Sequence, residues 1–237
     1  MKKLCLFLLL CFVAVPLATA ATRDDGPIEV DWYPLFTDSV GWNIYSGGFL
    51  VGWTGAMNAP APMDVAMGRS MELAWLNVVG AKLNTGHGQR ITMGVGIDWR
   101  NYRLAGNQCF AFDKECDLLR VDAYPDGAIH RLSRVKVFSL TVPVLLRQRL
   151  FNKVDIFAGP VLNFNVHASM LTKYRLDGAE VKHVSNHIHP VPVTVDVMGG
   201  VKWSCLGAYV RYSPCHVLRQ AHAPAFTTLS AGIFLGF

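Results

Sequence analysis

The stretch Phe226–Phe237 reads FTTLSAGIFLGF, and its alternation decides the fold class. Apolar side chains occupy every second position, with small or hydroxylated ones between them and one exception at Phe234. The apolar set is Leu229, Ala231, Ile233, Leu235 and Phe237. A period of two residues is that of a β-strand, in which successive side chains point to opposite faces. A strand needs about 9–11 residues to cross a membrane, so this stretch predicts a closing strand of sufficient length that ends on an aromatic residue.

The same alternation recurs upstream and predicts eight strands in all. They cover residues 40–52, 70–84, 90–103, 133–149, 153–167, 192–204, 206–214 and 226–237. The connections between them are alternately long and short, and the long ones are 53–69, 104–132, 168–191 and 214–225. Long external loops that alternate with tight periplasmic turns are typical of outer-membrane barrels, which have an even number of strands. The sequence therefore predicts an all-β fold, an eight-stranded antiparallel up-and-down transmembrane β-barrel.

The direction in which the apolar faces point separates two kinds of barrel. A soluble barrel buries them, whereas a membrane barrel turns them to lipid and its polar faces to the lumen. Alternation alone fits both, so a soluble periplasmic ligand-binding barrel remains an alternative. The aromatic residues favour the membrane, since they would form two girdles at its interfaces. These are Trp99, Phe138, Phe164 and Tyr212 at the external end, and Trp203 and Phe237 at the periplasmic end.

The amino-terminal residues 1–20 have the features of a secretory signal peptide. Lys2 and Lys3 precede a short apolar core, and Ala18 and Ala20 form a small-residue cleavage motif. We expect residues 21–39 to be a periplasmic leader and 40–237 to be the outer-membrane barrel. The formal net charge is +5 and falls by two with the signal, which is too weak a bias to indicate nucleic-acid binding.

Four cysteines follow the signal, and an oxidising compartment would permit disulfides among them. Cys109 and Cys116 lie close together in one long connection and are the predicted pair. Cys205 and Cys215 flank a predicted strand. That strand would hold them about 30 Å apart, beyond the roughly 7 Å that a bridge allows.

Two neighbouring predicted strands carry a family resemblance. SLTVPVLLRQRL (139–150), a short turn and VDIFAGPVLNF (154–164) resemble the PorT-like outer-membrane β-barrel family that is abundant in Bacteroidetes. The matching residues are Leu140, Pro143, Val144, Leu145, Leu146, Ala158, Gly159 and Pro160. The resemblance implies an eight-stranded barrel in the outer membrane and no shared catalytic set. The histidine-rich connections and their cysteines depart from the family pattern.

Charged residues on the polar faces would lie inside the barrel. The set expected near the periplasmic end is Lys82, Arg147, Arg149, Asp155 and Lys202, and the set near the external end is Glu72, Asp98, Arg100, Asp196 and Arg211. Both signs occur at both levels, so we expect paired charges to plug the lumen. A narrow pore is the alternative.

Histidines suggest two further hypotheses. Seven lie at or beyond the external strand ends, namely His130, His167, His183, His187, His189, His216 and His222. Their spacing matches no closed metal motif, and we predict no metal site and no cofactor. His167 and Ser169, with Glu180 further along, could form a weak hydrolase set resembling that of barrel-shaped lipid A deacylases. No other motif supports catalysis, so we predict that the protein is not an enzyme.

The sequence thus predicts an integral protein of the cell outer membrane, with a plugged polar lumen and four external loops in a structural or surface-binding role. Expected partners are outer-membrane lipid and, through the carboxy-terminal strand, the barrel assembly machinery. The connection 104–132 is the best candidate for an extracellular partner. Its CFAFDKEC segment would present Phe110, Ala111 and Phe112 in an exposed ring.

Overall fold

The computed structural model describes residues 42–86, 89–113, 115–151, 153–186 and 188–235. The predicted signal peptide, the leader and Phe237 lie outside these residues. The elements are β1 (Trp42–Met57), η1 (Met67–Arg69), β2 (Met71–Gly86), β3 (Gln89–Arg103), β4 (Gln108–Asp113), β5 (Leu118–Ala123), β6 (Ile129–Phe151), β7 (Val154–Leu176), β8 (Ala179–Ser185), β9 (Val193–Trp203), β10 (Leu206–Ser213) and β11 (Thr227–Leu235). Within the described residues, no helix has the length and apolar character needed to cross a membrane.

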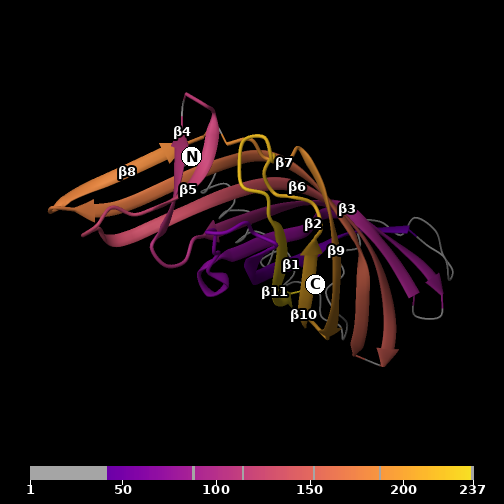
Figure 1. Cartoon of the computed structure of the whole chain (residues 1–237). Coiled ribbons are helices and arrows are strands. Elements are labelled where there is room, and N and C mark those ends of the chain that lie inside the picture. Colours follow the sequence, from indigo (N-terminus) through magenta and orange to yellow (C-terminus); the bar gives the residue numbers. More distant parts are fainter. Residues whose placement is uncertain (1–41, 87–88, 114, 152, 187, 236–237) are drawn as a thin grey trace.

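Eight of these strands form a closed antiparallel ring, as the alternation predicts. Around it, β6, β3, β2, β1, β11, β10, β9 and β7 each pair with the next, and β7 pairs back to β6. The pairing of β1 with β11 joins the first and last strands in antiparallel register, from Phe49 opposite Leu235 to Met57 opposite Thr227. Each ring strand lies beside its neighbours in sequence (Figure 1), so the predicted eight-stranded up-and-down barrel is confirmed.

The long connections contain more regular structure than the sequence indicates. β6 and β7 have 23 residues each, about 75 Å of extended chain, which is more than twice the thickness of a bilayer core. Their outer ends continue with β8 as a sheet that projects beyond the ring, and β4 and β5 form a separate hairpin (Figure 1). Beyond the ring, a strand no longer has one apolar face and one polar face. The alternation of side chains therefore could not reveal these extensions.

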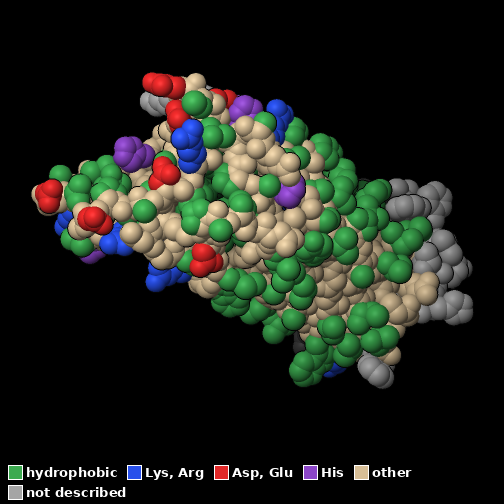
Figure 2. Space-filling model, in the orientation of Figure 1, with side chains coloured by type: hydrophobic (Ala, Val, Ile, Leu, Met, Phe, Trp, Pro, Cys, Tyr) green, Lys and Arg blue, Asp and Glu red, His purple; other side chains and the backbone are tan. Residues whose placement is uncertain are grey.

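The outward faces of the ring strands are apolar. The exposed side chains include Val51, Trp53, Leu73, Val79, Met93, Val95, Trp99, Leu140, Leu146, Phe164, Val195, Val197, Val201, Trp203, Val210, Tyr212, Ile233 and Leu235. Figure 2 shows hydrophobic side chains spread over the ring strands, while charged and histidine side chains gather at the end that carries β4, β5 and β8. The barrel therefore turns apolar groups outward, the reverse of a water-soluble sheet.

The barrel interior is layered, and it contains apolar layers that the prediction of a plugged polar lumen did not include. One layer is an apolar cluster of Leu50, Ala74, Leu76, Leu145, Phe157, Val161, Met198, Tyr209 and Phe234. Phe234, the exception in the alternation of β11, is fully buried there with its ring centroid 5.1 Å from that of Phe157. Gly48 lies beside this ring with φ +88°, and an added Cβ would lie 3.0 Å from the Phe234 ring, so both space and backbone conformation favour glycine.

A second apolar core closes the mouth of the barrel that carries the long connections, and we call it the external cap because the sequence predicts that these connections are external. It is built from Met63, Val65, Tyr102, Leu104, Phe110, Leu119, Val135, Val137, Ala168, Met170, Ile188, Val217, Leu218, Ala223 and Phe226. These residues come from all four long connections and from the inward faces of the ring strands. The connections therefore fold together over the barrel as one packed unit.

Candidate functional site

The centre of the lumen holds a cluster of five charged side chains, which we call the lumen cluster. Its members are Glu72, Asp98, Arg100, Asp196 and Arg211, the set that the sequence places near the external end, and each is at most 7% exposed. They come from four strands, β2, β3, β9 and β10. Alternation aims them inward, and closure of the ring brings their charged groups into contact.

Two guanidinium groups link the carboxylates of the lumen cluster. Arg211 Nη1 lies 2.8 Å from Glu72 Oε1 and 3.0 Å from Asp98 Oδ2, and its Nε lies 2.7 Å from Asp196 Oδ2. Arg100 Nη2 pairs with Asp98 Oδ2 at 2.9 Å and also with Asp196. Buried ions are tolerated only when paired and hydrogen-bonded, and these contacts meet that condition for both arginines.

Neutral side chains complete the network around the lumen cluster. Tyr209 donates its hydroxyl hydrogen to Glu72 Oε2 at 3.2 Å, and Arg211 Nη2 donates to Asn163 Oδ1 at 2.5 Å. The cluster is thus held on one side by Tyr209, which also belongs to the apolar layer. Tyr209 and Asn163 are buried like the charged side chains that they contact.

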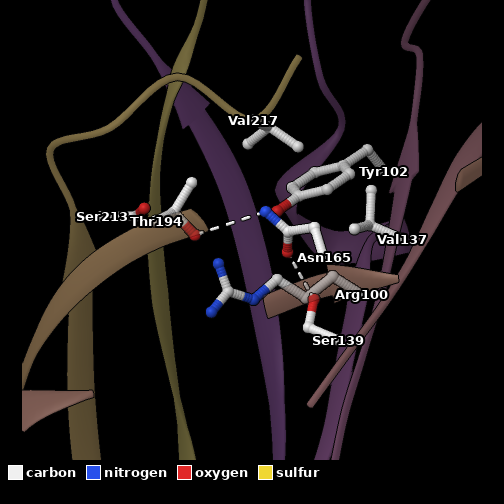
Figure 3. A pocket seen from close by; sticks show the side chains of 8 residues that line it. All are labelled: Arg100, Tyr102, Val137, Ser139, Asn165, Thr194, Ser213 and Val217. Atoms are coloured by element: carbon white, nitrogen blue, oxygen red, sulfur yellow. Dashed lines mark hydrogen bonds between the residues drawn. The ribbon is translucent and has the colours of Figure 1, made fainter. Parts of the chain in front are cut away.

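A small cavity separates the lumen cluster from the external cap. Figure 3 shows its lining, in which Asn165 is hydrogen-bonded to Ser139 and Thr194 and Arg100 enters from the cluster. Its volume is about 10 Å³, room for about one water molecule. Ligand pockets occupy roughly 300–1,000 Å³, so this cavity cannot hold a small-molecule ligand.

The end of the lumen expected to face the periplasm carries both signs of charge, with four basic side chains and one acidic one. Lys82 and Lys202 are buried, and Arg147 lies with its guanidinium carbon 5.7 Å from the centroid of the Phe234 ring. Arg149 Nε lies 3.5 Å from Asp155 Oδ1 in a partly exposed pair. The apolar layer lies between these charges and the lumen cluster.

The structure does not bring together His167, Ser169 and Glu180, the three residues of the hydrolase hypothesis. A bulge at Val166 shifts the register of β7 against β6, and His167 is exposed. Glu180 forms an ion pair with Lys173 at 2.9 Å and lies opposite Arg175. Arg175 is six residues along β7 from Ser169, so Glu180 lies about 20 Å along the strand from Ser169 at 3.4 Å per residue. These three side chains therefore cannot act as one nucleophilic set.

The hairpin β4–β5 carries both cysteines of the predicted bridge, and both are free thiols in the structure. Cys109 lies in β4 opposite Asp122, whereas Cys116 lies in the turn beyond Asp113. The intervening strand spans about 14 Å, against the roughly 7 Å limit for a disulfide. Burial, with a smaller contribution from the Asp122 carboxylate, raises the pKa of the Cys109 thiol.

The apolar residues of the same hairpin pack inward. Phe110 is 1% exposed and belongs to the external cap, with Phe112 packed against it. The expectation of an exposed ring at Phe110 is therefore wrong, because hairpin pairing directs this side chain onto the barrel mouth. At the base of the hairpin, burial raises the pKa of Tyr124 to about 12, and its ring makes an edge contact with Tyr174.

The turn of the hairpin is ordered by its own polar groups. Asp113 Oδ1 accepts hydrogen bonds from the backbone N–H groups of Glu115 and Cys116, and these bonds lower the pKa of Asp113. Asp117 follows with φ +50°. Its carboxylate meets His189 and His222, two of the seven external histidines, and one ligand atom from each of the three side chains lies within 4.8 Å of the others. Sequence spacing missed this group, since its members come from three connections.

Comparisons with known proteins find a similarity among solved structures. No family model matches the chain, and no curated protein matches it. Among solved structures, it is similar to Ail, the attachment invasion locus protein of Yersinia pestis, with a TM-score of 0.34 and 9% sequence identity over 81% of this chain and 99% of that one. A similarity at this level carries no information on function.

Proposed function

We propose that this chain is an integral β-barrel protein of the outer membrane, exported by a signal peptide at residues 1–20. The closed lumen leaves the external surface as its working part, in a structural or surface-binding role. The single observation that carries the proposal is the inverted wall, with apolar side chains outside and the lumen cluster inside. Only a hydrocarbon surrounding makes this arrangement favourable, because water would face a continuous apolar belt.

The aromatic side chains at the two edges of the apolar outer surface support placement of the barrel in a membrane. Trp53, Trp99, Phe164 and Tyr212 are exposed towards one end, and Trp203 is 70% exposed at the other. Aromatic rings favour both membrane interfaces. The sequence resemblance to PorT-like barrels adds to this reading.

Basic side chains lie directly beyond the external girdle. Arg103 lies opposite Arg134 between β3 and β6, and Lys136 Nζ lies 5.6 Å from the centroid of the Trp99 ring. Anionic phosphates at the outer membrane surface would neutralise these neighbouring cations. Their position fits a membrane boundary at the level of Trp99.

The interior argues against the alternative functions. Three successive layers fill the lumen, namely the apolar layer, the lumen cluster and the external cap. A pore would need a continuous water-filled path, and a ligand-binding barrel would need a cavity many times larger than about 10 Å³. We therefore expect no single-channel conductance steps in planar bilayers.

Membrane fractionation with a heat-modifiability gel tests the proposal. We expect the protein in the outer-membrane fraction, with different gel mobilities before and after boiling, because the closed barrel should resist SDS until heated. A matched periplasmic protein serves as the fractionation control. Recovery of a monomer that is soluble without detergent would contradict the membrane assignment.

A further inference from the structure

Asp117, His189 and His222 converge on the outer surface, and we call them the loop triad. His189 Nε2 lies 2.8 Å from Asp117 Oδ2, and His222 Nδ1 lies 3.5 Å from the same oxygen. The two imidazole rings have centroids 4.5 Å apart. Asp117 belongs to the β4–β5 turn, His189 to the connection before β9 and His222 to the connection before β11.

The backbone around the loop triad is fixed by contacts that do not involve its side chains. Leu119 donates its backbone N–H to the carbonyl of His222 at 2.7 Å, and Arg219 donates to the carbonyl of His189 at 3.0 Å. Ile188 and Ala223, each next in sequence to one of the histidines, are buried in the external cap. The three side chains are therefore presented by packed backbone and are held in a defined arrangement.

The donor set indicates a particular class of ion. Two imidazole nitrogens and one carboxylate oxygen suit zinc and related transition metals, whereas calcium and magnesium need several oxygen ligands. With metal–ligand bonds of about 2.0–2.1 Å, tetrahedral geometry places donor atoms about 3.3 Å apart. The two observed distances to Asp117 Oδ2, 2.8 and 3.5 Å, lie on either side of this value. His222 Nδ1 also lies 3.0 Å from the backbone carbonyl oxygen of Asp117, and it would give up this hydrogen bond when it binds the ion.

We propose that the loop triad binds one divalent transition-metal ion of the zinc type. The three side chains are 34–46% exposed, which gives the ion a path of entry and leaves the fourth coordination position open to solvent. The bound ion would connect the β4–β5 hairpin to the two connections that precede β9 and β11. Metal binding at the loop triad does not depend on whether the barrel lies in a membrane. The bound ion would hold these three connections together.

Calorimetry with zinc chloride on the detergent-solubilised protein, carrying no polyhistidine tag, tests this site. We expect one saturable site per chain in the native protein. His189→Ala and Asp117→Asn should each weaken binding at least about tenfold, since the loss of even an outer-shell partner of a metal ligand costs 10–100-fold. Two controls should bind zinc like the native chain: His183→Ala, a histidine of β8 outside the triad, and Cys116→Ser, the exposed thiol beside Asp117.

A second measurement separates loss of ligand from loss of fold. Each variant is first shown to form the barrel by its heat-modifiability. Zinc should then slow proteolysis of the external connections at least about tenfold in the native protein, in line with the linkage between a bound ion and local stability, but not in His222→Gln. Absence of saturable heat in the native protein, or equal loss of binding in His183→Ala, would overturn the proposal.

Discussion

At the scale of the residue, Arg211 is the side chain on which the interior depends most. It contacts three carboxylates, and its side chain is fully buried. Without it, Arg100 alone would face Glu72, Asp98 and Asp196. Removal of one partner from a buried ionic group leaves charges that neither water nor protein compensates.

Arg211→Met should therefore lower the free energy of unfolding by about 3–5 kcal/mol. Urea titration in lipid vesicles, read by the heat-modifiable gel shift, measures the change. Arg149→Met is the matched control, because its pair with Asp155 is 3.5 Å long and partly exposed and should contribute about 1 kcal/mol or less. Adding Asp196→Asn to Arg211→Met should recover part of the loss. Equal effects of the two arginine substitutions would show that the lumen cluster is not under this electrostatic constraint.

Cys109 offers a pH-dependent test of the hairpin. Only a thiolate is alkylated, and burial together with Asp122 raises the pKa of this thiol, so less thiolate exists at a given pH than for a free thiol of pKa about 8.5. In a variant that keeps only Cys109, the alkylation rate should rise with pH to a midpoint above that of free cysteine. Restricted access alone would lower the rate at every pH without moving the midpoint.

The same labelling tests the predicted Cys109–Cys116 bridge in the native protein. If both thiols are free, Cys116 reacts without prior reduction. Labelling of Cys116 only after treatment with a reductant would support the bridge, and the hairpin would have to open to bring the two sulfurs together.

At the scale of the element, a substitution at the centre of β3 tests whether the outward face of this strand meets lipid or water. Val95 is 54% exposed on the outward face. Val95→Arg should lower stability in vesicles by about 2–4 kcal/mol, as expected for a cation near the bilayer midplane. Val184→Arg is the control, since Val184 has similar exposure, 56%, but lies in β8 beyond the ring. We expect it to change stability by about 0.5 kcal/mol or less, and equal costs at the two sites would contradict the membrane wall.

At the scale of the whole molecule, the proposed membrane placement puts the two ends of the barrel in different compartments. Cys116 is exposed in the β4–β5 turn, and Cys205 is exposed in the short β9–β10 turn at the opposite end. In single-cysteine variants, a membrane-impermeant maleimide should label Cys116 in intact cells and Cys205 only after permeabilisation. Labelling in the reverse order would invert the proposed topology.

The sequence by itself determined the ring of strands, its closure in sequence order and the inward placement of the five lumen-cluster residues. All of these follow from a period of two, which is a local property that any strand pair shares. Phe234 follows the same rule although it breaks the chemical pattern. It is an aromatic residue on the face of small and hydroxylated residues, and its position on that face turns it into the barrel.

Only the tertiary structure decided which of these side chains touch. Arg211 and Glu72 are 139 residues apart in sequence, and Asp117 lies 72 and 105 residues from the histidines it contacts. The outward projection of β6 to β8, the burial of Phe110 and the separation of Cys109 from Cys116 likewise depend on how the hairpins pair beyond the barrel wall. There, the strands have no barrel wall with one apolar and one polar face, and the contacts join connections that lie far apart in the sequence.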